Sequence, residues 1–148
     1  MSNSNKDDLK INIGLIGLGY IGSEVFRLIQ NQHGYIQKKI GRDLNVKIIA
    51  EKDAARIREF KKVYSEAVFT DDAEKVINDP DVDIIIELVG GINPALGYIT
   101  GALRNGKYVV TANKDLIAKK GAKIFHEAAK SNVDILFEAS VGGGIPII

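Results

Sequence analysis

The feature that most constrains the fold is a regular alternation of short apolar runs with amphipathic stretches. Ile11 to Ile16 is rich in isoleucine, and Val82 to Val89 contains three consecutive isoleucines, as expected for strands buried on both faces. Between such runs, apolar residues recur at the spacing of one helical face. Strands regularly separated by helices form right-handed crossovers and a parallel sheet. The sequence therefore predicts an α/β domain with a doubly wound, mostly parallel sheet.

The same alternation gives the bounds of the expected elements. Asp71 with Glu74 resembles a capping box at the start of a helix that Pro80 closes. Asn93 followed by Pro94 resembles a helix cap with a first-turn proline. The expected strands are 11–16, 45–50, 67–70, 82–89, 107–112 and 133–138, and the expected helices are 21–32, 35–40, 54–62, 71–80, 93–105 and 114–130, the last with a break near Gly121.

Size and composition exclude several classes of function. The 148 residues leave room for one domain, and 20 basic against 19 acidic residues give a net charge of +1. That balance offers no electrostatic attraction to nucleic acid or to an anionic membrane. No apolar run approaches the ~18 residues that cross a bilayer, and the absence of cysteine excludes disulfides and thiolate chemistry. We therefore expect a soluble, cytoplasmic protein that binds neither nucleic acid nor membrane.

A glycine-rich segment, Gly17-Leu18-Gly19-Tyr20-Ile21-Gly22, matches the dinucleotide-binding fingerprint. It lies between an expected strand and an expected helix, which is the context that phosphate binding requires. The first glycine permits a tight turn, the second lets a pyrophosphate approach the backbone, and the third lets the helix pack on the strand. The free N–H groups and dipole of the helix then attract the phosphates. The pattern predicts a Rossmann-type dinucleotide-binding domain over residues 11–140, preceded by a flexible tail over residues 1–10.

Charged residues at the expected carboxyl ends of the strands are candidates for ligand binding, because ligands of such sheets bind there. Glu51 and Lys52 end the second strand and point to opposite sides by strand alternation. Glu51 favours NAD through the ribose 2′-OH, whereas Lys52, with Arg56 and Arg58 soon after, favours NADP. Further candidates are Lys114 at a helix start and Glu87 and Glu138 at strand ends, whereas His33 and His126 are expected on the surface without carboxylate partners.

Several motifs besides the fingerprint resemble the cofactor domain of homoserine dehydrogenases. They are Gly41-Arg42-Asp43, Asp79-Pro80-Asp81-Val82-Asp83, Glu87-Leu88-Val89-Gly90-Gly91, Thr111-Ala112-Asn113-Lys114 and Phe137-Glu138-Ala139-Ser140-Val141 leading into Gly144-Ile145-Pro146. The resemblance implies an NAD(P)-dependent oxidoreductase that interconverts L-homoserine and L-aspartate 4-semialdehyde. This reaction lies on the branch to threonine, isoleucine and methionine. The resemblance further implies a homodimer when the enzyme is complete.

The resemblance also assigns roles to individual residues. It gives Lys114 a catalytic role beside the nicotinamide, where an ammonium can stabilise a developing alkoxide. The cofactor contacts that it implies are Gly17, Gly19, Tyr20, Ile21, Gly22, Lys52, Gly90 and Lys114, and the implied monovalent-cation site, for sodium, consists of Glu138, Val141, Gly143 and Ile145. Because Lys52 stands toward the adenosine in that pattern, we expect NADP to be preferred, with NAD also accepted.

The last residues of the sequence, 142–148, are glycine-rich and then apolar without a cap, which is unusual for a finished domain. We therefore expect an amino-terminal part of a longer enzyme, in which residues 141–148 begin the connection to a substrate domain. One alternative is the cofactor domain of a sugar or cyclitol oxidoreductase, although Ala112-Asn113-Lys114 stands where that class has Glu-Lys-Pro. A non-catalytic nucleotide-sensing domain is the other.

Overall fold

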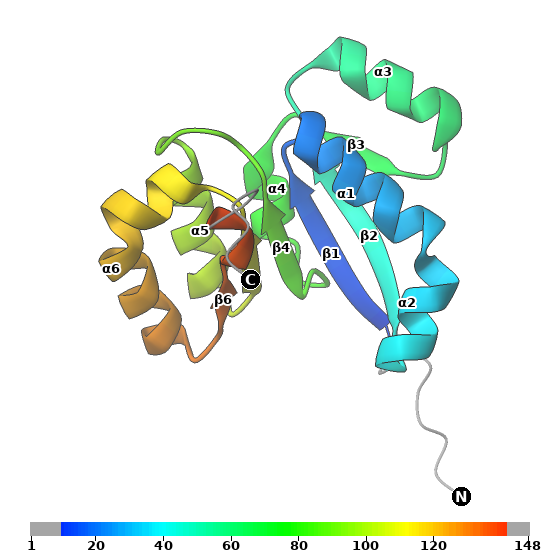
Figure 1. The fold of residues 1–148 in the computed structure, drawn as a ribbon. Coiled ribbons are helices and arrows are strands. Elements are labelled where there is room, and N and C mark those ends of the chain that lie inside the picture. Colours follow the sequence, from blue (N-terminus) through cyan, green and yellow to red (C-terminus); the bar gives the residue numbers. More distant parts are fainter. Residues whose placement is uncertain (1–9, 142–148) are drawn as a thin grey trace, which may run out of the picture.

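A six-stranded sheet forms the centre of the computed structural model, which describes residues 10–141 (Figure 1). The strand order is β3-β2-β1-β4-β5-β6, and every neighbouring pair is parallel. This order confirms the predicted doubly wound sheet, with its switch point between β1 and β4. The strands are β1 (Lys10–Ile16), β2 (Asp43–Ala50), β3 (Val68–Thr70), β4 (Ile84–Glu87), β5 (Tyr108–Thr111) and β6 (Ile135–Leu136).

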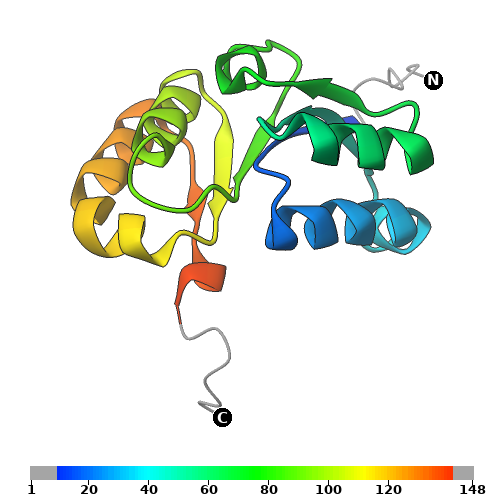
Figure 2. The same cartoon turned by 90° about the horizontal axis from the view of Figure 1, so that it is seen from above.

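Helices cover both faces of the sheet, as the view from above shows (Figure 2). α1 and α3 pack on one face through a cluster that contains Phe26 and Phe60. α4, α5 and α6 pack on the other face, around Ile85, Ile99 and Leu116. The helices are α1 (Tyr20–Asn31), α2 (His33–Ile40), α3 (Ala54–Val63), α4 (Ala73–Ile77), α5 (Ala95–Arg104) and α6 (Lys114–Ser131), and a short 3₁₀ helix, η2, spans Glu138–Ser140.

Two predicted helix starts are wrong by one or two residues. The carboxylate of Asp72, not of Asp71, caps α4 by accepting a hydrogen bond from Glu74 N at 2.9 Å. Since Glu74 is then only the second helical residue, it cannot form the reciprocal bond of a capping box. α5 has Pro94 itself at the cap position and no side-chain cap, so that Asn93 lies outside the helix.

Three further predictions concern where elements end. α6 continues through Gly121 without the expected break. The ring of Phe125, one turn later, lies 3.2 Å from where a Cβ on Gly121 would be, so this glycine makes room inside an intact helix. β4 and β6 are shorter than expected, and the chain after β6 turns into η2. The strand β1 begins at Lys10, one residue inside the predicted tail, whose other residues lie outside the described part of the chain.

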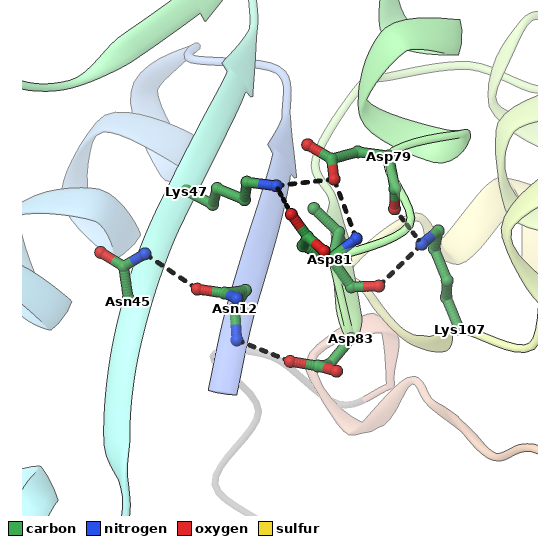
Figure 3. Close-up of polar contacts among 8 residues, drawn as sticks. Asn12, Asn45, Lys47, Asp79, Asp81, Asp83 and Lys107 are labelled. Atoms are coloured by element: carbon green, nitrogen blue, oxygen red, sulfur yellow. Dashed lines mark hydrogen bonds and ion pairs between the residues drawn. The ribbon is translucent and has the colours of Figure 1, made fainter. Parts of the chain in front are cut away.

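A network of charged side chains holds the connection between α4 and β4 at the amino ends of the strands (Figure 3). The Lys47 ammonium donates to Asp79 Oδ1 at 2.7 Å and to Asp81 Oδ2 at 2.8 Å. The buried Lys107 ammonium donates to the carbonyl oxygens of Asp79 and Val82, at 2.6 and 2.7 Å. Burial lowers the pKa of Lys107, and the nearby aspartates partly restore it. The Asp79–Asp83 motif therefore has a structural role, far from the carboxyl edge.

Both histidines are exposed, but one of them has a carboxylate partner. His33 is exposed as expected, yet its Nε2 pairs with Asp43 Oδ1, a partner ten residues away that the sequence pattern did not reveal. His126 is exposed. Within residues 10–141, no helix is long and apolar enough to cross a membrane.

Candidate functional site: two cavities beside a glycine turn

The glycine turn between β1 and α1 occupies the carboxyl edge of the sheet at its switch point. Gly17 has a φ of +95°, a conformation that favours glycine, and its N–H donates to Ala50 O at 2.9 Å. A Cβ on Gly22 would lie 2.0 Å from Gly17 O, so only glycine lets α1 begin this close to β1. Gly19 differs, because a Cβ there would meet nothing nearer than Arg56 Nη1, at 3.8 Å. The side of Gly19 toward which a Cβ would point is therefore open, and a phosphate can approach the backbone there.

Two cavities adjoin this turn and share Leu88 and Val89. The first, of about 260 Å³, extends from the turn toward the ends of β2 and β3. The second, of about 490 Å³, extends toward the ends of β4 and β5. Ile16, Gly17, Gly19, Ala50, Glu51, Lys52, Asp71, Ala73, Leu88, Val89, Pro94 and Tyr98 line the first, and Ile21, Leu88, Val89, Gly90, Gly91, Ala112, Asn113, Lys114, Asp115, Ala139 and Ser140 line the second.

Glu51 ties the glycine turn to the end of β2. Its Oε2 accepts a hydrogen bond from Leu18 N at 2.7 Å, and its Oε1 accepts from the backbone N–H groups of Lys52 and Asp53, at 2.8 and 2.9 Å. The predicted opposite orientation of Glu51 and Lys52 is not observed, since both line the first cavity. Strand alternation does not apply to them, because β2 ends at Ala50.

Asn113 organises the second cavity, although it was not among the predicted site residues. Its Nδ2 donates to the carbonyl oxygens of Val89 and Gly91, at 3.0 and 2.6 Å, and its Oδ1 accepts from Leu116 N at 3.2 Å. One amide thus joins the loop after β4 to the start of α6. Its signals in the sequence were its place in the Thr111–Lys114 motif and its position before a helix, where asparagine is a common cap.

Lys114 is the first residue of α6 and lines the second cavity. Within residues 10–141, no carboxylate lies in ion-pair distance of its ammonium, and its side chain is exposed. A cation at this position faces the positive end of the helix dipole, which disfavours it for helix stability. The ammonium is thus placed where it can meet an anionic or polarised group in the second cavity.

A buried carboxyl, Glu87, lies under the second cavity at the end of β4. Its Oε2 accepts from Thr111 Oγ1 at 2.7 Å, and its Oε1 accepts from Val89 N at 2.6 Å. Burial raises the pKa of Glu87, and these two hydrogen bonds only partly oppose that effect. Thr111 Oγ1 also accepts from Asn113 N at 3.1 Å, so that Glu87 supports the loop that Asn113 holds.

The structure brings most of the predicted cofactor residues to the two cavities. Gly17, Gly19 and Lys52 line the first, and Ile21, Gly90 and Lys114 line the second. Tyr20 is 87% exposed and Gly22 contacts the turn, so neither lines a cavity. Of the predicted cation ligands, Glu138 and Val141 are exposed, and Gly143 and Ile145 lie outside the described residues. No cluster of three or more acidic or histidine side chains suited to a metal occurs in the part of the chain described.

Comparison with known proteins decides the family. The family model of the homoserine dehydrogenase NAD-binding domain matches residues 17–138. The chain belongs to the homoserine dehydrogenase family. The homoserine dehydrogenase of Bacillus subtilis is 43% identical over 138 residues, which are 93% of this chain and 31% of that relative. The homoserine dehydrogenase of Neisseria gonorrhoeae is 37% identical over 138 residues, with the same two coverages.

Solved structures of homoserine dehydrogenases have the same fold. The crystal structure from Thiobacillus denitrificans superposes with a TM-score of 0.83 at 37% identity, over 93% of this chain and 31% of that one. The structure from S. aureus at pH 8.5 gives 0.81 at 38% identity, over 89% and 33%. The chain thus spans 31% of the length of the curated relatives named here. Membership in this family confirms the resemblance seen in the sequence and excludes the sugar or cyclitol oxidoreductase.

Proposed function

We propose that this chain binds a nicotinamide dinucleotide across the glycine turn, as the cofactor part of a homoserine dehydrogenase. The observation that carries the proposal is the pair of cavities that adjoin one glycine turn, in which Gly19 leaves the backbone open to a phosphate. The adenosine half fits the first cavity, between the ends of β1 and β2, and the nicotinamide half fits the second. We infer NADP as the preferred cofactor and NAD as an accepted one.

The chain's own residues would bind and orient the reactants. The N–H groups at the start of α1, around Tyr20 and Ile21, would donate to the pyrophosphate. The ammonium of Lys114 would stabilise negative charge on the substrate oxygen, as it forms in the conversion between L-homoserine and L-aspartate 4-semialdehyde. When bound, the cofactor supplies hydride transfer. Asn113 would hold the loop after β4 in place beside Lys114.

Sodium binding, a homodimeric assembly and a cytoplasmic location belong to the same proposal and stay predictions. The cation site expected at Glu138, Val141, Gly143 and Ile145 would use mainly backbone carbonyl oxygens, which are suitable hard ligands. It is tested by measuring cofactor binding and activity of the complete enzyme in sodium and in a large organic cation. Equal activity in both would contradict the site.

Calorimetry with NADP and NAD tests the cofactor proposal directly on this chain. We expect binding of both, and no rise in reduced-cofactor absorbance when homoserine is added, because the groups that position a substrate are expected in a further domain. The complete enzyme should show that rise. If the chain binds neither dinucleotide, the proposed function is wrong. If the complete enzyme binds NADP without oxidising homoserine, the nucleotide-sensing alternative is favoured.

A further inference from the structure

The guanidinium of Arg56 lies against the open side of the glycine turn, although Arg56 belongs to α3. Its Nη1 donates to Leu18 O at 3.2 Å and lies 3.8 Å from where a Cβ on Gly19 would be. Within residues 10–141 its remaining N–H groups form no hydrogen bond, and the side chain is 40% exposed. A cation with unused donors therefore faces the space that a phosphate would enter.

The carboxylate of Glu51 does not compete for that role. Three backbone N–H groups already bind its two oxygens, and its side chain is only 13% exposed. A carboxylate selects NAD when it accepts hydrogen bonds from the ribose hydroxyls. In this structure the Glu51 carboxylate instead holds the glycine turn to the end of β2. Arg56 Nη1 lies 3.9 Å from Glu51 Oε2, close enough to offset the negative charge that would repel a further phosphate.

The other charged side chains near Arg56 do not cancel the positive charge beside the glycine turn. Lys52 is exposed and lines the first cavity at the end of β2. The Asp53 carboxylate caps α3 by accepting from Ala55 N and Arg56 N, which lowers its pKa and directs it to the helix. Asp71 also lines the cavity, but it follows β3, two strand spacings or about 9.5 Å from β1. Arg56 therefore contacts the turn itself, and Lys52 lines the cavity that adjoins the turn on its β2 side.

We propose that Arg56 is a specificity-determining residue that binds the 2′-phosphate of NADP together with Lys52. This inference rests on the proposed function of the cofactor site. The pyrophosphate is expected at the start of α1, whereas the adenosine ribose is expected beside the end of β2, between Lys52 in the first cavity and Arg56 at the glycine turn. The planar guanidinium can donate two parallel hydrogen bonds to a phosphate, which an ammonium cannot. Arg56 thus adds a geometric preference to the charge of Lys52.

Titration of four forms of the chain with NADP and with NAD tests the inference. In Arg56→Ala the dissociation constant for NADP should rise by about tenfold to a hundredfold, as for loss of hydrogen bonds to a charged group. The constant for NAD should change much less than the constant for NADP, because NAD has no 2′-phosphate for the guanidinium to bind. Arg56→Lys should restore part of the NADP affinity. Arg58→Ala, which removes the same charge from an exposed position of the same helix, is the matched control and should resemble wild type.

Three other outcomes would overturn the inference, each for a different reason. An equal loss of NADP and NAD affinity would show that the guanidinium acts on the pyrophosphate or only on the shape of the turn. An equal NADP loss in Arg58→Ala would indicate long-range charge rather than contact. A wild-type preference for NAD that Arg56→Ala leaves unchanged would also refute it. Failure of wild type to bind either dinucleotide would instead refute the proposed function, and circular dichroism of every variant identifies any that fails to fold.

Discussion

Two glycines of the same turn should respond in opposite ways to a single added methyl group. Gly22→Ala places a Cβ 2.0 Å from Gly17 O, a backbone atom that cannot rotate away. Gly19→Ala places a Cβ 3.8 Å from the end of a flexible arginine side chain, which is ordinary contact. Gly19 also has a φ of −63°, which an alanine adopts without strain. The first change should damage the fold and the second should damage only the function.

The structure gives the size of each effect. Relieving the overlap at Gly22 requires α1 to move from β1 by more than about 1 Å, and overpacking of this kind costs typically 1–3 kcal/mol or more. We expect at least about 3 kcal/mol, because the obstacle is backbone. Gly19→Ala should leave stability unchanged within about 0.5 kcal/mol or raise it slightly, since alanine restricts the unfolded chain. Its methyl would nevertheless occupy the opening for the pyrophosphate and weaken NADP and NAD alike.

Urea denaturation followed by circular dichroism, with calorimetry of dinucleotide binding, measures both effects. The expected result is a lower midpoint for Gly22→Ala, and for Gly19→Ala a wild-type midpoint with weaker binding of both cofactors. Gly19→Val, which has a larger side chain, should lose more affinity while keeping the circular dichroism spectrum. A Gly22→Ala chain as stable as wild type would refute the close-packing argument. Unchanged affinity in Gly19→Ala would show that the phosphates bind elsewhere.

Three further predictions concern charged groups. Lys107→Met should destabilise the fold by about 2–3 kcal/mol in urea denaturation, because it leaves the carbonyl oxygens of Asp79 and Val82 without their buried donor; an unchanged midpoint would contradict this. Burial raises the pKa of Glu87 above its ordinary 4.5, so the native state holds this proton more tightly than the unfolded chain does. Wild type should therefore lose stability relative to Glu87→Gln as pH rises above about 4.5 through the raised pKa. A stability difference that does not depend on pH would refute that account. In the complete enzyme, Lys114→Ala should lower kcat by about 10²- to 10³-fold with a smaller change in cofactor affinity; a change in cofactor KM alone would make it a binding residue.

The glycine turn and the parallel sheet were predictable from the sequence because both depend on local patterns. A strand that is buried on both faces is apolar in its buried part, as in Ile13 to Ile16 of β1 and Ile84 to Ile86 of β4, whatever surrounds it. Likewise Gly17 and Gly22 are required by backbone geometry within six residues, so their spacing alone marks the turn. The ends of elements were less predictable. Asp71 and Asp72 are adjacent carboxylates of equal capping ability, so the sequence alone does not show that Asp72 takes the cap position of α4.

The roles of the charged side chains were decided only by the tertiary structure. Glu51 reaches Leu18 across 33 residues and Arg56 reaches it across 38, through contacts that exist only because β1 and β2 pair in one register. From sequence, Glu51 and Lys52 appeared as competing selectors of NAD and NADP. In the folded chain Glu51 is bound by backbone N–H groups, while Arg56, on another element, lies at the turn. Local spacing thus fixes where a dinucleotide can bind, whereas the partner of each charge depends on which distant segments the fold brings together.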